Sequence, residues 1–399
     1  MRDTAPFRSR SSTHFPSESI RPFRVQIPQA KIDDLHARLD RARWPDELPG
    51  TDWNRGVPAP FIQSLAHYWR TAYDWRRHET YLNRFAQYTT EVDDTRIHFL
   101  HVRSSEPGAM PLLLLHGWPG SVVEFLEVIG PLTEPSAHGA PGSPAFHVVI
   151  PSLPGHGLSG PIHQPGWTNW RMAKAFAALM ARLGYQRYGI QGGDAGAFIA
   201  PEMGRLNPEP VAGVHVNALV TFPSGDPTEI ASLTEAEKER LARLKHYKED
   251  MMGYAHMQGT RPQTLAYGLT DSPVGQLAWI VEKFKEWTDP AAKFAENPLN
   301  TDIILTNTSL YWFTATAGSS ANLYYENLHD PNAWAPRQRS TVPTGVLVSL
   351  TRDVSIRRFA DRDHQITHWT ESQVGGHFFA LEQPFFFVQD VRTFFRSLE

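Results

Sequence analysis

The chain has 399 residues, enough for one large domain with insertions or for two domains, and its formal net charge is −4 with no Lys/Arg-rich block. That charge argues against nucleic acid as a partner, and the lack of Cys excludes disulfides, thiol catalysis and thiolate metal ligands. Every apolar run in the sequence is too short to cross a bilayer, so we expect no membrane anchor and a cytoplasmic protein.

In the N-terminal part of the chain, the sequence predicts two helices that precede the first expected strand. Residues 1–21 are polar, and we interpret them as a mobile leader. Apolar residues at helical spacing predict one helix after Pro28, expected to stop at Trp44-Pro45, and a second over Phe61–Ala72. A strand is expected at Arg96–Val102.

From Met110 onward, short apolar strands alternate with helical segments, which predicts an α/β fold with a mostly parallel sheet and helices on both faces. Between Thr221 and Pro343 the strand pattern gives way to charged helical segments such as Thr234–Lys248 and Leu277–Lys285, which indicates an inserted helical cap. The expected strands are Pro111–Leu115, Phe146–Ile150, Tyr188–Gln191, Ala212–Val216, Val342–Leu350 and Gln365–Trp369.

The most informative turn follows the strand expected at Tyr188–Gln191. Gly192-Gly193-Asp194-Ala195-Gly196 lies between that strand and a helix expected over Ala197–Leu206, which is the strand, turn and helix of a nucleophile elbow. The glycines permit a strained backbone that exposes the central side chain above the sheet. A polar turn without catalytic function is the alternative, and the pentapeptide alone predicts it about equally well.

An aspartate at the centre of the elbow changes the chemistry expected there. The carboxylate of Asp194, with a reference pKa near ~3.9, is ionised at neutral pH and attacks without the help of a base. Its targets are carbons that carry a leaving group. The substrates expected are therefore epoxides or alkyl halides rather than ordinary esters.

Two further turns lie where such a nucleophile needs partners. The Gly-rich turn His116–Ser121 directly follows an apolar strand, so we expect the backbone N–H groups of Trp118 and Ala195 to form an oxyanion hole. Trp118-Pro119 is also a candidate cis peptide. His377 follows the last expected strand, which is the place of the base in hydrolases whose triad runs nucleophile, acid, His.

The sequence leaves the acid and the oxygen-binding group more open. Asp353 follows the strand before the last and is the expected acid, with Asp361 and Asp363 as alternatives. An exposed loop charge is the non-catalytic interpretation of Asp353. An epoxide oxygen needs a hydrogen-bond donor as its C–O bond breaks, and a phenol of the cap can supply one. Composition does not choose among Tyr247, Tyr254, Tyr267, Tyr311, Tyr324 and Tyr325.

Over nearly all residues after about Ile20, the chain resembles the microsomal and juvenile hormone epoxide hydrolases, a family with the α/β-hydrolase fold. Several ordered blocks of this kind are specific, whereas any one alone is not. The blocks are Pro22–Arg103, His116–Ser121, Tyr254–Thr264 continuing through Asp271–Gly275 to Glu282-Lys283, and Gly375–Leu381.

The resemblance implies roles for individual residues. Asp194 becomes the nucleophile and His377 the general base, with Trp118 beside the substrate and no metal or organic cofactor. Tyr254 and Tyr324 become the pair that holds the epoxide oxygen, with Tyr325 a neighbouring rival of Tyr324. The implied activity is conversion of an epoxide to a vicinal diol through a covalent aspartyl ester that a His-activated water hydrolyses.

Three departures from the family pattern bear on the site. Ala195 stands where members commonly have Trp, which keeps the backbone donor but removes a bulky wall, so we expect a bulky, hydrophobic epoxide as the small-molecule partner. Asp353 is displaced by about one position from the family's usual place for the acid. Membrane-bound relatives carry an N-terminal anchor, which we do not expect here.

The sequence divides into five predicted segments: a leader (1–21), an N-terminal epoxide-hydrolase-type domain (22–107), the first part of the α/β-hydrolase core (108–221), a helical cap (222–340) and the second part of the core (341–399). The alternatives to an epoxide hydrolase are a haloalkane dehalogenase, which shares the aspartyl ester, and a non-catalytic binding homologue. Ala195 weighs against the dehalogenase, because such enzymes commonly hold the halide with an indole N–H beside the nucleophile. Homo-oligomer formation is left open.

Overall fold

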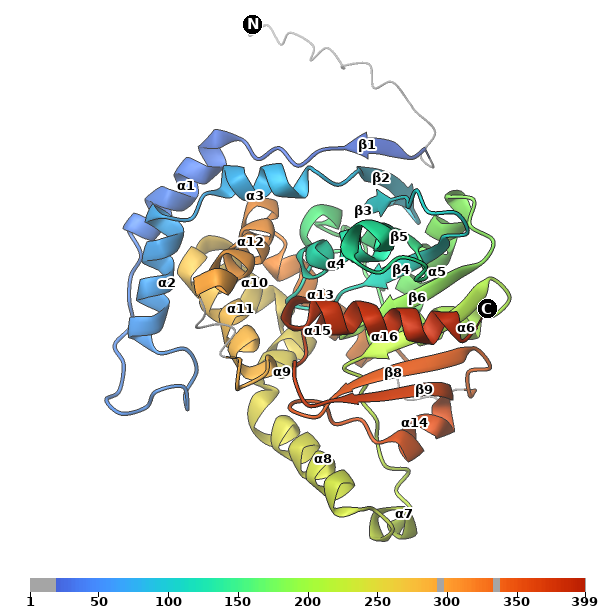
Figure 1. Cartoon of the computed structure of the whole chain (residues 1–399). Coiled ribbons are helices and arrows are strands. Elements are labelled where there is room, and N and C mark those ends of the chain that lie inside the picture. The colour runs from blue at the N-terminus through green and yellow to red at the C-terminus, as the bar shows by residue number, and fades with distance from the viewer. Residues whose placement is uncertain (1–18, 293–297, 333–337, 399) are drawn as a thin grey trace, which may run out of the picture.

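The computed structural model describes residues 19–292, 298–332 and 338–398, and its centre is a nine-stranded sheet (Figure 1). The strand order is β1-β2-β3-β5-β4-β6-β7-β8-β9. Strands β1 (Arg21–Phe23), β2 (Gln87–Val92) and β3 (Thr95–Val102) are antiparallel, and β3 joins β5 antiparallel. The remaining strands run parallel: β4 (Met110–Leu115), β5 (Phe146–Pro151), β6 (Tyr188–Gly192), β7 (Val211–Asn217), β8 (Pro343–Ser349) and β9 (Gln365–Ser372).

Helices cover both faces of the parallel strands, as the alternating pattern predicts. On one face lie α4 (Leu126–Thr133), α15 (Phe379–Glu382) and α16 (Pro384–Arg396), and on the other α5 (Asn169–Arg182) and α6 (Ala195–Leu206). Leu112 and Leu114 of β4 belong to the core of the first face, whereas Leu113 and Leu115 belong to the core of the second. A strand covered on both faces is apolar throughout, which explains the uninterrupted leucines.

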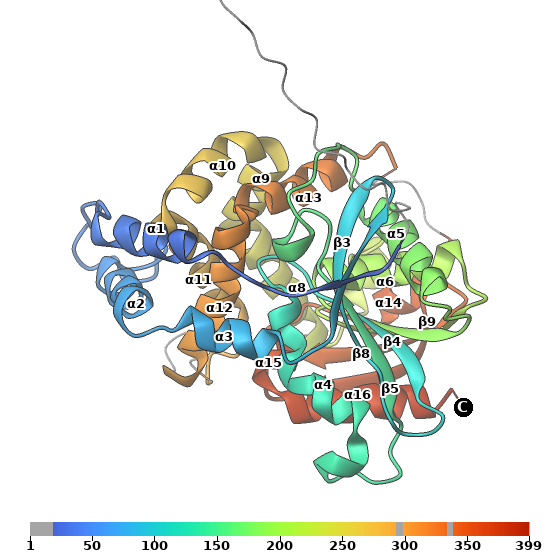
Figure 2. The ribbon, with the colours of Figure 1, turned by 90° about the horizontal axis from the view of Figure 1, so that it is seen from above.

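Among its described residues, the cap between β7 and β8 has helices joined by loops and no strand. The short α7 (Pro227–Ala231) and α8 (Glu235–His246) lead through a π-helical turn (Tyr247–Met251) into five further helices. These are α9 (Gly253–Thr260), α10 (Pro262–Asp271), α11 (Pro273–Trp287), α12 (Pro298–Thr314) and α13 (Ala317–His329). Figure 2 shows α9–α13 gathered beside the sheet, with α1 and α2 on their outer side.

The N-terminal region corrects two expectations. Helix α1 (Gln29–Asp40) ends at Asp40 and does not continue to Trp44-Pro45, because the N–H groups of Arg41 and Ala42 bond to carbonyls only three residues back in a tight final turn. The predicted leader (1–21) lies mostly outside the described residues, and Arg21 already belongs to β1. Helix α2 (Ala59–Thr71) is close to its predicted range, whereas α3 (Trp75–Leu82) has no counterpart among the sequence predictions.

Helices α1–α3 pack against α11 and α12 of the cap (Figure 1). The indole N–H of Trp69 donates to Ser309 Oγ at 3.0 Å, and the Tyr73 hydroxyl lies 3.0 Å from the Thr306 hydroxyl. The N-terminal helices therefore rest on the same helix, α12, that reaches toward the sheet.

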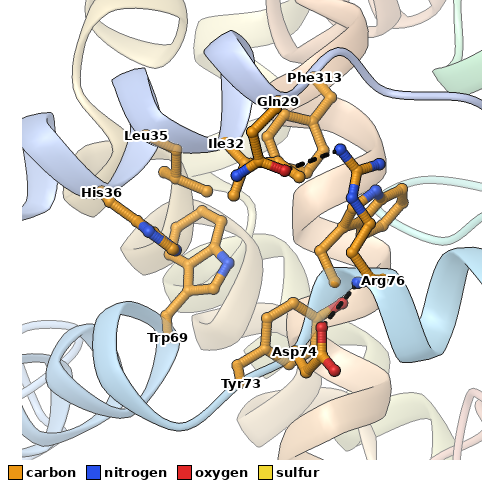
Figure 3. Close-up of a pocket in the computed structure, with 10 residues that line it drawn as sticks. Gln29, Ile32, Leu35, His36, Trp69, Tyr73, Asp74, Arg76 and Phe313 are labelled. Atoms are coloured by element: carbon orange, nitrogen blue, oxygen red, sulfur yellow. Dashed lines mark hydrogen bonds between the residues drawn. The ribbon is translucent and has the colours of Figure 1, made fainter.

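A cavity of about 170 Å³ lies between α1, α2, α3 and the end of α12 (Figure 3). Its lining is mainly aromatic and aliphatic, with Gln29 and Arg76 paired at its rim by a 3.0 Å hydrogen bond. It contains none of the predicted catalytic residues. Within the described ranges, no helix combines the length and the apolar character needed to cross a membrane.

Candidate active site

The turn between β6 and α6 is a strained elbow with Asp194 at its apex. Asp194 has φ 53° and ψ −120°, a conformation that costs free energy for any residue with a side chain. A Cβ at Gly192 would overlap the carbonyl of Gly196, and a Cβ at Gly196 would overlap the carbonyl of Leu115. Only glycine fits at both positions, and the chain therefore turns sharply enough to project the carboxylate from the sheet.

The carboxylate of Asp194 contacts the first of the two backbone donors that the sequence predicts for an oxyanion hole. The Trp118 N–H donates to Asp194 Oδ1 at 3.0 Å, and the Ala195 N–H, the second predicted donor, contributes to a lowered pKa of the carboxyl group. The Trp118-Pro119 peptide is cis, as predicted. The turn carrying Trp118 thus meets the elbow directly, although 76 positions separate Trp118 from Asp194 in the sequence.

His377 faces the other oxygen of the same carboxylate. Its Nε2 lies 3.2 Å from Asp194 Oδ2, an ion-pair distance, with a ring orientation that is not aligned for a hydrogen bond. The backbone N–H of His377 donates to the Trp287 carbonyl at 2.8 Å, and the Trp287 ring centroid lies 4.9 Å from the imidazole. Exposed fractions of 19% for the His377 side chain and 22% for that of Asp194 leave both groups within reach of a small molecule.

The electrostatics of the pair favour a carboxylate and an imidazolium in the free enzyme. Burial opposes ionisation of Asp194, but His377 and the N–H groups of Trp118 and Ala195 outweigh it and hold the pKa of Asp194 below its ordinary value. For His377, burial lowers the pKa, but the charge of Asp194, with smaller effects from Asp353 and Glu382, outweighs it and raises the pKa.

Asp353 lies in the loop after β8, close enough to His377 for the two charges to act on each other. It is 7% exposed, and the Ser349 N–H donates to its Oδ2 at 2.8 Å. Burial raises the pKa of Asp353 to about 6, against the opposing effect of the Ser349 N–H and His377. The alternatives lie on α14 (Arg357–Asp363), where Asp361 is exposed and Asp363 is half-buried. Among the three, the position and burial of Asp353 fit the acid of a triad best.

The structure separates two tyrosines from the other candidates. The rings of Tyr254 and Tyr324 lie 5.6 Å apart, and both contact the Trp118 ring, at 5.2 and 5.9 Å. Burial is the main reason why the pKa of each phenol is well above its ordinary value, so both are neutral donors. The two phenols expected to hold the epoxide oxygen thus lie together beside the turn that contacts Asp194.

The other four tyrosines have different surroundings. Tyr247 comes nearest to the site, because its hydroxyl lies 2.9 Å from that of Tyr254. Tyr311 is buried and donates to the Gly120 carbonyl at 2.7 Å. Tyr267 is 72% exposed, and Tyr325, the predicted rival of Tyr324, is 37% exposed and stacks on His329.

Sequence reasoning missed the residues that join these parts. Trp287 contacts His377, Tyr254 and Trp118 at once, yet the helix predicted over Leu277–Lys285 stopped short of it. Asn307 of α12 donates to the Pro119 carbonyl at 2.7 Å, and Tyr311 donates to the next carbonyl, that of Gly120. Residue contacts of this kind join distant parts of the chain and leave no local pattern in the sequence. For Trp287, the available signal was a helix prediction that could have been extended by two residues to the end of α11. In the parts of the chain that the structure describes, no three His, Asp or Glu side chains converge to hold a metal ion.

Comparison with known proteins agrees with this geometry. Residues 20–125 match the model of the epoxide hydrolase N terminus, and residues 110–262 match that of the alpha/beta hydrolase fold. Epoxide hydrolase 1 of Sus scrofa is 34% identical over 413 residues, which cover 96% of this chain and 90% of the relative. The chain belongs to the epoxide hydrolase family. A Stigmatella aurantiaca protein provisionally named an epoxide hydrolase is 45% identical over 95% of this chain and 85% of its own length.

Solved structures of the family have the same fold throughout. The juvenile hormone epoxide hydrolase of the silkworm Bombyx mori superimposes with a TM-score of 0.88 at 31% identity, over 96% of both chains. The Aspergillus niger epoxide hydrolase gives a TM-score of 0.83 at 31% identity, over 96% of this chain and 97% of its own. The protein is therefore an epoxide hydrolase of the α/β-hydrolase fold, as the sequence predicts, and neither a dehalogenase nor a non-catalytic homologue is favoured.

Proposed function

We propose that Asp194 is the nucleophile that opens the epoxide and that His377 activates the water that releases the product. The observation that carries this proposal is the environment of one carboxylate. Its Oδ1 accepts the Trp118 N–H at 3.0 Å, and its Oδ2 lies 3.2 Å from the imidazole of His377. A carboxylate held in this way is ionised, oriented and placed beside both an oxyanion hole and a base.

In the first step, a carboxylate oxygen of Asp194 attacks one carbon of the epoxide, and the bond from that carbon to the ring oxygen breaks. Negative charge moves onto the departing oxygen, and Tyr254 and Tyr324 donate hydrogen bonds to it. One phenol gives its proton to this oxygen and becomes a phenolate. The product of the step is a hydroxyalkyl ester of Asp194.

In the second step, His377 takes a proton from water, and the hydroxide attacks the ester carbonyl. The Trp118 and Ala195 N–H groups stabilise the tetrahedral oxyanion, which collapses and expels the alkoxide form of the diol. The imidazolium returns its proton to the leaving alkoxide, and the new carboxyl group of Asp194 restores the phenol. Esterification removes the charge that raises the pKa of His377, so the imidazolium of the free enzyme releases its proton to solvent and burial then keeps the imidazole neutral when a base is needed.

The substrate that fits these surroundings is a bulky, apolar epoxide. Aromatic rings of Trp118, Tyr254, Trp287 and Tyr324 surround the site, and Ala195 contributes little volume beside the nucleophile. A homo-oligomeric state and a cytoplasmic location stay predictions.

The covalent route is tested by a single turnover of styrene oxide in ¹⁸O-labelled water. Label should enter the Asp194 carboxyl group in the first turnover and reach the diol only in later ones, because water attacks the ester carbonyl. Mass spectrometry of the peptide and of the diol separates the two outcomes. Label in the diol of the first turnover would contradict a covalent intermediate, and Asp194→Asn, which cannot attack, is the inactive control.

A further inference from the structure

Lys283 is a buried cation of the cap that the two steps above do not use. It lies in the last turns of α11 with only 2% of its surface exposed, which is rare for lysine unless the charge is paired. Its Nζ lies 2.7 Å from Glu282 Oε1 and 2.6 Å from Glu286 Oε2. The ammonium thus donates a hydrogen bond to Glu286 and forms an ion pair with Glu282.

The ammonium also lies over the ring of Tyr254. Nζ is 4.8 Å from the centroid of that ring and 5.7 Å from the centroid of the Trp287 ring. Both distances are within the range in which a cation is attracted by the electron density of an aromatic face. Lys283 and Trp287 are one helical turn apart on α11, so they approach Tyr254 from the same side of the helix.

The two glutamates are more exposed to water than the cation that they contact. Their side chains are 27% and 29% exposed, so water reaches both carboxylates, although burial raises the pKa of Glu286. The Lys283 side chain is 3% exposed and Tyr254 is 6% exposed, and little solvent therefore separates them. The ammonium therefore faces the phenol ring across 4.8 Å with little water between them, and a charge acts more strongly across such a buried contact than across solvent.

Tyr254 needs such a field when the epoxide opens. Burial, then the neighbouring phenols Tyr324 and Tyr247 and the charge of Asp194, all raise its pKa and oppose negative charge on its oxygen. During ring opening the Tyr254 hydroxyl donates to an oxygen that becomes an alkoxide, and electron density shifts into the phenol. A cation on the ring face opposes these effects and favours that shift.

We propose that Lys283 is a positioning residue for ring opening, which acts through Tyr254 by strengthening the hydrogen bond that this phenol donates to the epoxide oxygen. The inference rests on the proposed role of Tyr254. Ester hydrolysis depends on His377 and the oxyanion hole, so the cation influences the first step and leaves the second unchanged.

The test is the rate of ester formation in a single turnover of styrene oxide, followed by tryptophan fluorescence and by mass spectrometry of quenched enzyme. Lys283→Met should slow ester formation about tenfold while ester hydrolysis changes less than about twofold. Lys283→Arg, which keeps the charge, should restore most of the rate. Lys285→Met removes a neighbouring cation that lies over Trp53, and it should change neither step.

The same Lys283→Met change in an enzyme that already lacks the Tyr254 hydroxyl separates an effect through Tyr254 from a general structural effect. In Tyr254→Phe enzyme, adding Lys283→Met should slow ester formation by less than about twofold, because the phenol through which the cation acts is already gone. A tenfold loss in both backgrounds, or an equal loss in both steps, would overturn the inference. If Tyr254→Phe alone forms the ester at the wild-type rate, the proposed role of Tyr254 fails first.

Lys283→Gln covers the case in which the methionine variant does not fold. Its amide can still donate to the glutamates but carries no charge, so the same slowing of ester formation is expected. Wild-type ester formation in a folded Lys283→Gln enzyme would overturn the proposal as well.

Discussion

At the scale of single residues, a mutation of Asp353 should distinguish the two catalytic steps most clearly, because its proposed role belongs to ester hydrolysis alone. The carboxylate acts on His377 through its charge, which favours the imidazolium that forms when water is deprotonated. Asp353→Asn should leave ester formation largely intact and slow ester hydrolysis by roughly a thousandfold or more. Mass spectrometry should then show the aspartyl ester accumulating.

Asp361→Asn is the matched control for this change, because Asp361 is the exposed alternative on α14. It should turn over normally. Ester accumulation in the Asp361 or Asp363 variant, together with normal turnover in the Asp353 variant, would move the acid to the other residue.

Acidic pH should separate the two steps in the unmodified enzyme. Ester hydrolysis needs an ionised Asp353 and a neutral His377, and since the pKa of Asp353 is about 6, the step is lost as pH falls through that value. Ester formation needs only an ionised Asp194, whose pKa is lowered, so it persists to more acidic pH. The fraction of esterified enzyme should rise below about pH 6. Quenched-flow mass spectrometry across pH measures it, and a common apparent pKa for both steps is the contrary outcome.

The sequence predicts candidate site residues where a local pattern exists. Asp194 and His377 follow strands in positions that the fold reserves for a nucleophile and a base, and the roles predicted for Tyr254 and Tyr324 follow from the resemblance to a family. Trp287 has no such pattern, because its contacts with His377 and Trp118 join residues far apart in the chain. Only packing reveals it.

At the scale of elements, α12 holds the turn that carries Trp118, the proposed oxyanion donor. Asn307 and Tyr311, one helical turn apart, donate to the consecutive carbonyls of Pro119 and Gly120 at 2.7 Å each. These carbonyls immediately follow Trp118, whose N–H contacts Asp194. Side chains of α12 therefore orient the turn by binding its backbone carbonyl groups.

Removal of one of these donors should affect catalysis more than stability. Tyr311→Phe leaves the Gly120 carbonyl without its donor, at a cost of about 1–3 kcal/mol in the free energy of unfolding. We expect ester hydrolysis to slow at least about tenfold, because a small displacement of the turn misplaces the Trp118 N–H. Single-turnover rates and denaturant unfolding measure the two effects.

Tyr73→Phe is the matched control, since it removes another buried phenol that contacts α12, through Thr306. It should lower stability and leave hydrolysis within about twofold of the wild-type rate. Equal loss of hydrolysis in both variants would show that α12 acts only through general stability.

Elements with strong patterns were predicted well. All six expected strands of the parallel sheet are present. Central strands such as β4 and β5 are buried on both faces and mostly apolar, whereas the edge strand β9 is more polar and less buried. Strands β1 and β2 and helix α3 were missed. β2 (Gln87–Val92) is rich in polar residues and is fixed by pairing with β3, and α3 is short and begins with an Asp74 cap rather than an apolar repeat.

At the scale of the whole molecule, the N-terminal helices and the cap form one packed unit. Trp69 of α2 and Tyr73, just after this helix, are hydrogen-bonded to α12, and the Lys31 ammonium of α1 donates to the Phe313 carbonyl at 2.8 Å. The apolar residues of α1 and α2 belong to the same core as the cap helices and one face of the sheet. A boundary near residue 107 thus separates segments of sequence that share a core.

Shared packing predicts a single cooperative unfolding transition. Trp69 is 1% exposed, and Trp69→Ala removes a buried aromatic ring and its hydrogen bond to Ser309, at a cost of about 3–5 kcal/mol. Because α12 carries both this contact and the donors to Pro119 and Gly120, the loss should lower the stability of the catalytic turn together with that of the N-terminal helices. Denaturant unfolding followed by circular dichroism and by loss of ester formation should give coincident midpoints, both shifted down in the variant. An early transition in circular dichroism that leaves ester formation intact would show instead that the N-terminal helices unfold as a separate domain.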